Sequence, residues 1–312
     1  MEFMKTNIKI KMGICISCLF ILFASCSKER TEEKATAYAS LDEFYLNNAP
    51  EEQSFLIDSI AGDTIIGKEG TIIGDVPKTI FMYKSNFQDI TYPFELRLIE
   101  AYSMKDMILS RLPNVAQNNI LKSAGELKVT AWKNNNELAL KENCGLLMWA
   151  PAATPDNAMD VFYGFTAGTT SDWNNDVTLT DYLFTQDTVT KIGVLGKGYG
   201  MKIAKLGWLS VCKLNTFTST SGITFTAVGT NTNFIDIFIV FNNLHSYIKV
   251  NNLTVSNLPV GEPVTVFAIA KDTDASMYYF KQNYTISTSS IIIDLVMQKS
   301  TEAEVLTLMG SL

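Results

Sequence analysis

The sequence is poor in the residue that most often carries acid–base catalysis and metal binding. It holds a single histidine, His245, among 312 residues. A Ser-His-Asp or Cys-His system needs an imidazole next to a nucleophile and oriented by a carboxylate, and nothing local to His245 supplies either. Metal sites built on several histidines are excluded. We therefore interpret His245 as a residue of a strand-connecting loop and expect no cofactor.

Positive charge is also scarce. The chain has 25 Lys and Arg against 32 Asp and Glu, a net charge of −7, and loss of an N-terminal leader with Lys5, Lys9 and Lys11 would make the remainder more acidic. Proteins that bind nucleic acid need basic patches, so we expect no nucleic-acid partner. The same balance argues against electrostatic docking on anionic lipid.

The first apolar run is too short to span a membrane. It extends from Met12 to Ala24 without a charge, whereas a spanning helix needs roughly 20 apolar residues and a signal peptide roughly 7 to 15. The lysines before this run complete the pattern of an export signal. We expect residues 1–25 to be a signal peptide.

The run ends in Phe23-Ala24-Ser25-Cys26, which resembles the lipobox of bacterial lipoproteins. The resemblance implies that Cys26 is acylated, by diacylglycerol and fatty acids such as palmitate, and becomes the new N-terminus. The alternative is an ordinary cleaved signal peptide that happens to contain a cysteine. Residues 27–33 resemble the surface-export signal of Bacteroidota lipoproteins, although Arg30 interrupts the acidic run. We expect a protein anchored in the outer membrane by its lipid and exposed at the cell surface.

The other cysteines give little evidence for a disulfide scaffold. Cys15 and Cys18 lie in the expected leader, and Cys144 and Cys212 remain after export. Disulfide scaffolds are usually short and cysteine-dense, whereas this chain is long enough to rely on burial. Two buried free thiols are expected, with pairing left open.

Turn residues and periodicity predict a mainly β fold with short helices. Phe94, Leu96 and Leu98 alternate with polar or exposed positions, as in a strand with one buried face. Ser103 with Asp106 predicts the start of a short helix. Residues 127–140 predict a hairpin with its turn at 134–136, and Thr301 with Glu304 predicts a capping box.

Composition and motifs divide the chain into two tandem β-sandwiches behind an anchor. The predicted segments are the signal peptide at 1–25, an acylated cysteine and flexible tether at 26–53, a sandwich at 54–165, a loop or linker at 166–200, and a second sandwich with a terminal helix at 201–312.

Several short motifs resemble known domains. Gly70-Thr71-Ile72-Ile73 with Pro77, residues 94–100 and Met159-Asp160-Val161-Phe162-Tyr163-Gly164 look like the ZU-type β-sandwich domain of ankyrins and netrin receptors as it occurs in Bacteroidota surface lipoproteins. Leu258-Pro259-Val260-Gly261 resembles the turn that feeds a central strand in carboxypeptidase-regulatory-like and fibronectin-like sandwiches. The ZU-type resemblance implies an interaction or structural role and carries over no catalytic residues.

Two small groups are candidates for ligand binding. Asp172, Asn174 and Asp176 have the oxygen-ligand spacing of the first half of a calcium loop, although Val177 stands where such loops need glycine. Trp173, Tyr278 and Tyr279 would stack on sugar rings if they were exposed, and core packing is the alternative reading of these aromatic residues.

Two function classes remain open. The favoured hypothesis is a non-enzymatic cell-surface lipoprotein that binds a glycan or a protein partner, or that serves as a subunit of an envelope assembly. The alternative is a carbohydrate-active enzyme that uses a pair of loop carboxylates from the region between Asp156 and Asp187, since glycosidases need two acids that face each other.

Overall fold

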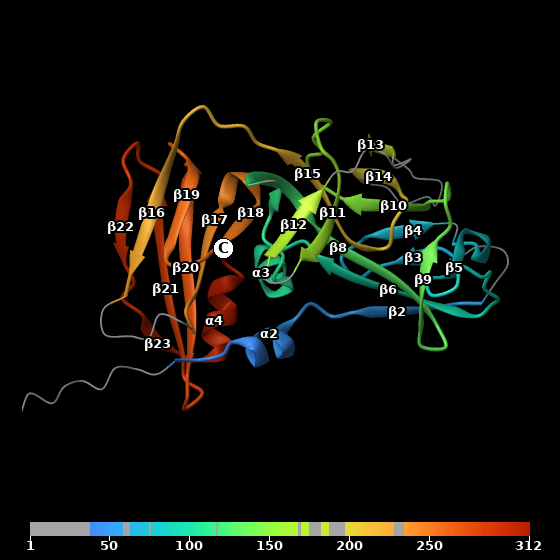
Figure 1. Cartoon of the computed structure of the whole chain (residues 1–312), viewed down its shortest axis with the longest axis horizontal. Coiled ribbons are helices and arrows are strands. Elements are labelled where there is room, and N and C mark those ends of the chain that lie inside the picture. The colour runs from blue at the N-terminus through green and yellow to red at the C-terminus, as the bar shows by residue number, and fades with distance from the viewer. Residues whose placement is uncertain are drawn as a thin grey trace, which may run out of the picture. The chain divides into compact units, whose positions relative to one another are not determined.

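The computed structural model describes residues 38–58, 63–74, 76–116, 118–167, 170–174, 182–186, 197–227 and 234–312. The expected signal peptide and Cys26 lie outside these residues. Residues from Ala37 onward form one compact unit, whose sheets and helices are shown in Figure 1. The fold is mainly β, and its sheets are antiparallel apart from one parallel pair, which confirms the predicted class. No helix of the described part is long and apolar enough to cross a membrane.

The first sandwich packs a nine-stranded sheet against a five-stranded one. The nine-stranded sheet contains β2 (Gln53–Ile57), β5 (Phe81–Tyr83), β6 (Phe94–Ala101), β7 (Val115–Ala116), β8 (Asn119–Lys133), β9 (Asn136–Leu140), β11 (Asp160–Ala167), β12 (Thr170–Asn174) and β15 (Gly207–Leu214). The five-stranded sheet contains β3 (Ile65–Ile66), β4 (Ile72–Gly74), β10 (Leu146–Pro151), β13 (Tyr182–Gln186) and β14 (Gly198–Ile203). A short 3₁₀ helix, η1 (Lys78–Ile80), precedes β5. Leu96 and Val129 of one sheet and Ile73 and Met148 of the other belong to the same buried core.

The pairing of the first sandwich continues past the predicted linker. Strand β14 pairs with β10, with Met201 opposite Met148, and β15 pairs with β8, with Leu209 opposite Leu127. Strands β12 and β13 lie within the segment that the sequence predicts as a loop or linker. In the structure, the first sandwich therefore reaches Leu214.

The second sandwich packs a six-stranded sheet against a three-stranded one. The six-stranded sheet contains β1 (Tyr38–Ala39), β17 (Asp236–Phe241), β18 (Ser246–Val250), β20 (Pro263–Asp272), β21 (Met277–Thr285) and β23 (Gln298–Ser300). The three-stranded sheet contains β16 (Thr220–Thr226), β19 (Thr254–Pro259) and β22 (Ile291–Asp294), and β16 pairs with β22 in parallel. Ile239 and Val266 meet Ile223 and Phe225 in the core between these sheets.

Helices cover the other face of the six-stranded sheet. They are α2 (Asp42–Asn48), α3 (Met104–Ser110) and α4 (Glu302–Met309). Phe238 and Phe267 of the sheet share a buried cluster with Phe44 of α2, Met107 of α3 and Val305 of α4. Because both faces of β17 and β20 are buried, these strands are nearly continuous apolar runs. Residues 38–48, which the sequence predicts as part of a flexible tether, form β1 and α2 in this arrangement.

The predicted local structures follow their physical causes. The Ser103 side chain accepts from the N–H of Asp106 at 3.1 Å and caps α3, and Thr301 and Glu304 form the expected capping box of α4. Strand β6 alternates buried and half-buried residues from Phe94 to Glu100. Strands β8 and β9 form the predicted hairpin. Asn134 and Asn135 take the positive φ that its tight turn requires, with values of 48° and 61°.

Candidate functional site

The outer face of the nine-stranded sheet carries a row of accessible polar and aromatic side chains. We call it the Trp132 face, and it comprises Ser54 and Leu56 of β2, Glu95, Arg97 and Ile99 of β6, Lys128, Thr130 and Trp132 of β8, and Trp208 of β15. Strand alternation explains why these residues share a face, because their chain neighbours point into the core. The register places Glu95 opposite Trp132 and Lys128 opposite Trp208.

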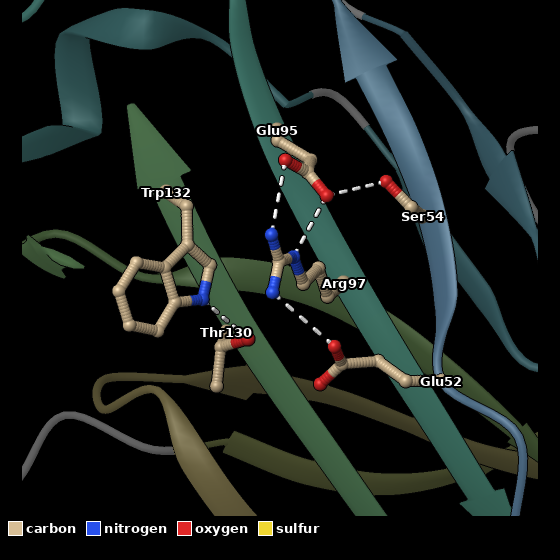
Figure 2. A network of polar contacts seen from close by, with 6 residues as sticks. All are labelled: Glu52, Ser54, Glu95, Arg97, Thr130 and Trp132. Carbon is tan, nitrogen blue, oxygen red and sulfur yellow. Dashed lines mark hydrogen bonds and ion pairs between the residues drawn. The ribbon is translucent and has the colours of Figure 1, made fainter. Parts of the chain in front are cut away.

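Arg97 lies at the centre of a polar network on this face, shown in Figure 2. Its Nε donates to Oε1 of Glu95 at 2.7 Å and its Nη2 donates to Oε2 at 3.2 Å, so the contact with Glu95 is bidentate. Nη1 donates to Glu52 at 3.3 Å, and the Ser54 hydroxyl donates to Glu95 at 2.6 Å. The network therefore joins β6 to β2 and to the residue that precedes β2.

The indole of Trp132 lies beside this network. The guanidinium carbon of Arg97 is 5.4 Å from the centroid of the Trp132 ring, within the range of a cation–π contact. Trp132 Nε1 donates to the hydroxyl of Thr130 at 3.1 Å, and Figure 2 shows the ring face-on above the strands. The ring is half-buried, so its orientation is fixed while part of its surface remains open to solvent.

Charge on the Trp132 face is nearly balanced. The hydrogen bonds from Arg97 and Ser54 hold the pKa of Glu95 below its usual range, and the bond to Glu95 raises the pKa of Arg97. Both groups are ionised at neutral pH. With Glu52, this network holds two acids around one cation, and it offers hydrogen-bond acceptors and donors without a strong positive field.

A second tryptophan repeats the arrangement on β15. Lys128 Nζ lies 5.8 Å from the centroid of the Trp208 ring. Gly164 of β11 makes room for both neighbouring tryptophans, because a Cβ there would lie 3.0 Å from Trp208 Cβ and 3.1 Å from the ring of Trp173. The Cα atoms of Trp132 and Trp208 are about 14 Å apart by strand geometry, since four residues and one strand spacing separate them.

Beyond Trp208, the same sheet face is buried under other parts of the chain, and we call this region the closed end. Glu126 of β8 is fully buried there, and its Oε1 accepts from Nδ2 of Asn114 at 2.9 Å. Asn114 in turn bonds the main chain of Tyr247 in the second sandwich. Burial raises the pKa of Glu126 well above its ordinary value, which favours the protonated form of this carboxyl.

His245 also lies at this closed end and does not form a catalytic group with the nearby hydroxyls. It ends the short 3₁₀ helix η3 (Asn242–Leu244) with a left-handed φ of 47°. Its Nδ1 is 3.3 Å from the carbonyl oxygen of Ser123, whereas the Ser123 hydroxyl bonds Ser210 at 3.1 Å. Burial lowers the pKa of His245. The structure places His245 in a connection between strands, where the sequence predicts it, and packs it against β8.

The aromatic residues proposed from the sequence are not brought together. Trp173 of β12 is 1% exposed, and its Nε1 donates to the carbonyl of Pro113 at 3.0 Å, so its ring is core and offers no face for stacking on a sugar. Tyr278 and Tyr279 lie on β21 of the second sandwich. Tyr278 packs on Tyr38 with ring centroids 5.4 Å apart, and the Tyr279 hydroxyl donates to Gln298 at 2.8 Å.

The structure describes two of the three proposed calcium ligands. Asp172 accepts from the N–H of Trp173 at 2.8 Å through Oδ1, and Asn174 is exposed at the end of β12. Asp176 lies outside the described residues. In the part of the chain that the structure describes, no three His, Cys, Asp or Glu side chains are grouped so that they could hold a metal ion.

The structure describes three of the six aspartates in the region from Asp156 to Asp187 that was proposed for an enzyme. Asp156 pairs with Lys213 at 2.6 Å and with Lys122 at 3.6 Å, and the bond from Lys213 lowers its pKa. Asp160 Oδ1 accepts from the N–H of Val161. Asp176, Asp181 and Asp187 lie outside the described residues. Asp172, the third described acid of this region, accepts from the N–H of Trp173, so each of the three has a local partner other than a second carboxylate.

The two remaining cysteines are free thiols. Cys144 is half-buried and Cys212 is buried. Burial raises the pKa of Cys212 to about 12, which leaves the thiol protonated and unreactive.

Sequence reasoning missed the two tryptophans of the Trp132 face. Only Trp132 carried a usable local signal. Leu127, Val129 and Ala131 alternate toward the core. Trp132 stands one position after this series, which places its side chain on the opposite face of the strand. Trp208 follows a glycine at the start of a strand, and its exposure depends on the neighbouring strands, which the local pattern does not show.

Comparison with known proteins adds little. No family model and no curated protein matches the sequence. Among solved structures, a crystal structure of gamma-CGTase from alkalophilic Bacillus clarkii aligns with 75% of this chain at 9% identity, with a TM-score of 0.18. The aligned part is 41% of that enzyme chain.

Proposed function

We propose that this protein is a non-enzymatic, lipid-anchored cell-surface protein that binds an oligosaccharide on the Trp132 face. The observation that carries the proposal is the pair of half-buried tryptophans, Trp132 and Trp208, each held beside a cation on one sheet face. Aromatic rings of this kind offer an apolar surface to a sugar ring. The fixed polar groups beside Trp132, Thr130 and the Arg97–Glu95 pair, offer hydrogen-bond partners for the hydroxyl groups of a glycan.

The geometry favours a chain of sugars over a single sugar. Because the two tryptophans are about 14 Å apart, one monosaccharide cannot contact both. A flat sheet face with its contacts in a row instead suits an extended oligosaccharide that lies along the strands.

The charges favour a neutral glycan. Arg97 is matched by Glu95 and Glu52, and the whole chain carries a net charge of −7. Sulfated or uronic-acid polymers would meet a negative protein. A neutral polysaccharide meets no such penalty.

The test is a glycan array followed by calorimetric titration of the mature protein. Neutral oligosaccharides are expected to bind, and Trp132→Ala and Trp208→Ala are each expected to weaken binding about tenfold or more, as truncation of an aromatic residue that anchors a ligand costs roughly 2 kcal/mol or more. Tyr279→Ala is the matched control, because it removes a half-buried aromatic ring from the second sandwich. Binding that is unaffected by both tryptophan changes, or turnover of a polysaccharide that Asp172→Asn abolishes, would contradict the proposal.

The lipid anchor and the cell-surface location of the protein are tested separately. Labelling with a radioactive fatty acid is expected in the unmodified protein and is expected to disappear in Cys26→Ala. Protease treatment of intact cells is expected to degrade the anchored protein. Labelling that persists in Cys26→Ala would remove the lipid anchor from the proposal, and resistance to the protease would place the protein inside the envelope.

A further inference from the structure

A cavity with a volume of about 650 Å³ lies at one end of the five-stranded sheet. Its lining includes Trp149 and Pro151 of β10, together with Glu69, Tyr102 and Lys197. The remaining lining residues are small, namely Ala124, Ala152 and Ala153. Sites for small molecules typically have volumes of roughly 300 to 1,000 Å³. The cavity is therefore of a size that suits a small ligand.

Trp149 lies on the outer face of the five-stranded sheet. Its neighbours Met148 and Ala150 belong to the core of the first sandwich, and strand alternation turns Trp149 the other way. Its side chain is nonetheless only 7% exposed. Its Nε1 is buried and has no hydrogen-bond partner among the described residues. Because a buried indole N–H usually finds a partner, the cavity contains an unused donor.

Two glycines make room for the aromatic rings of the cavity. A Cβ at Gly198 would lie 2.6 Å from Cε2 of Trp149, the ring carbon bonded to Nε1. A Cβ at Gly125 would collide with the ring of Tyr102. The Tyr102 hydroxyl is 2.8 Å from the hydroxyl of Thr71, which fixes the direction of this ring. Both rings are thus in place before a ligand arrives, which lowers the entropic cost of binding.

Two opposite charges lie on either side of β10 at this cavity. Strand β10 lies between β14 and β4. Pro151 pairs with Gly198 of β14, so Lys197 lies on that side, next to the Nε1 edge of the indole. On the β4 side, a Cβ at Gly70 would lie 3.6 Å from Cγ of Pro151, and Glu69 precedes this glycine. The side chains of Glu69 and Lys197 are exposed, and neither has an ion-pair partner in the part of the chain that the structure describes.

The turn that carries Glu69 is held from below by a buried acid. Glu100 is 6% exposed, and its carboxylate accepts from the N–H of Glu69 and from the N–H of Thr71, both at 2.9 Å. Gln53 Nε2 donates to the same carboxylate at 2.8 Å. The main chain of the turn is therefore fixed, while the Glu69 carboxylate stays at the rim of the cavity.

We infer that this cavity binds a small zwitterion, an amino acid or a short peptide with free termini. The ligand carboxylate pairs with Lys197 and accepts from Nε1 of Trp149, and the ligand ammonium pairs with Glu69. A ligand with only one charge would meet a like charge on one side of the cavity. The alanines of the lining leave space for a ligand side chain beside the ring of Tyr102. None of the lining residues belongs to the Trp132 face.

The test uses the full mature protein and a panel of free amino acids, dipeptides and tripeptides. The chain has four tryptophans, so a two-dimensional NMR spectrum shows up to four indole N–H signals, and Trp149→Phe assigns one of them. Members of the panel are expected to shift the Trp149 signal as its N–H gains an acceptor. Saturation by amino acids would identify free amino acids as the ligand, and a requirement for dipeptides or tripeptides would identify short peptides. Trp132→Ala is expected to leave this binding unchanged.

Matched ligands and variants separate the two charges. N-acetylation or C-amidation of the ligand is expected to weaken binding about tenfold, because each removes one charge. Glu69→Gln is expected to weaken the zwitterion by a similar factor and to leave the N-acetylated ligand unchanged. Lys197→Gln is expected to do the same for the C-amidated ligand. Lys68→Gln, in the same turn but outside the cavity lining, is the control and is expected to have no effect.

Trp149→Phe keeps a ring and removes the N–H, and it is expected to weaken binding about tenfold, as for a hydrogen bond to a charged group. Thermal unfolding shows whether each variant is folded. Because Glu69 and Lys197 are exposed, their substitutions test the inference even if Trp149→Phe does not fold.

Three results would overturn the inference. The first is a Trp149 signal that no member of the panel shifts at millimolar concentration. The second is binding that neither Glu69→Gln nor Lys197→Gln changes. The third is a shift of the Trp149 signal by neutral oligosaccharides and not by the panel, which would identify a sugar as the occupant.

Discussion

The outer faces of the two large sheets differ in what covers them. Helices α2, α3 and α4 bury the outer face of the six-stranded sheet, where Phe238 and Phe267 are at most 2% exposed. The Trp132 face of the nine-stranded sheet has no helix over it among the described residues and is held by polar contacts (Figures 1 and 2). A covered face contributes to stability, and an open face is available for binding.

Two glutamates on the same side of the nine-stranded sheet make this difference clear. Glu95 lies on the Trp132 face, where the hydrogen bond from Arg97 lowers its pKa, and Glu126 lies at the closed end, where burial raises its pKa. They are on neighbouring paired strands, and strand alternation gives them the same orientation. Coverage by the second sandwich therefore shifts a carboxyl toward its protonated form, whereas hydrogen bonds on the open face favour the ionised form.

The largest expected effect is on the covered face. Phe267→Ala would remove a fully buried ring from between β20 and the helices, and it is expected to lower the free energy of unfolding by about 3 to 5 kcal/mol. Ile99→Ala on the Trp132 face is the control, with an expected loss of about 1 kcal/mol, because a half-exposed side chain loses only part of the transfer free energy. Urea denaturation followed by fluorescence measures both. Equal losses would show that the two faces contribute alike to stability.

The second effect is the pH dependence that Glu126 imposes. Its pKa is raised in the folded protein. The contribution of this carboxyl to the free energy of unfolding is therefore fully present below the unfolded pKa of about 4.5. Stability is then lost as the pH rises from there toward the folded pKa, by about 1.4 kcal/mol per pH unit. Glu126→Gln keeps an acceptor for Asn114 and carries no charge. The variant is therefore expected to gain stability relative to the unmodified protein as the pH rises from 5 to 8.

Denaturation at several pH values measures this difference. Glu137→Gln on β9 is the control, since that side chain is 40% exposed, and it is expected to give no comparable slope. A difference between Glu126→Gln and the unmodified protein that stays constant from pH 5 to 8 would mean that Glu126 is already ionised in the folded state.

A smaller effect is expected from the cap of a covering helix. Thr301→Ala would remove the side chain that accepts from the N–H of Glu304 and would break the capping box of α4. The expected loss is about 1 kcal/mol. Thr307→Ala on the same helix is the control, because its hydroxyl bonds a carbonyl within the helix and caps nothing. Equal losses in the two variants would show that α4 is held by packing alone.

Local sequence signals were sufficient for much of the fold. The alternation of β6, the Asn134 turn and the Thr301 cap each depend on residues close together in the chain, and each appears in the structure. The sequence predicts residues 38–48 as tether because the stretch is polar and acidic apart from one short apolar segment, Leu41 and Phe44 to Leu46. Phe44 and Tyr45 are nonetheless buried, since α3 and β17 supply the partners from distant parts of the sequence.

The candidate site depended more on distant contacts. The pattern Asp172-Trp173-Asn174 predicts the start of a calcium loop. It lies instead in strand β12, where the Trp173 ring is buried in a cluster with Cys212. Trp132 and Trp208 are 76 positions apart in the sequence, and they share a face because β15 returns to pair with β8. The pairing of β15 with β8 is a long-range contact that no local sequence pattern predicts. The sequence alone therefore does not show that the two tryptophans share a face.

The smallest expected effect on stability is on the Trp132 face itself. Glu95→Gln would weaken the ion pair with Arg97, whose side chain is 33% exposed, and exposed pairs contribute at most about 1 kcal/mol. Because the folded pKa of Glu95 is lowered, its contribution is present above the unfolded pKa of about 4.5 and is lost as the pH falls through the folded pKa. Unfolding at pH 7 and at pH 3 measures this loss, with Ser54→Ala as the control that removes the hydroxyl and keeps the charge pair. Glycan binding is expected to fall more than stability does, because Arg97 would no longer be held beside Trp132. A loss of stability above about 2 kcal/mol would show that the open face, like the covered one, is built to hold the fold.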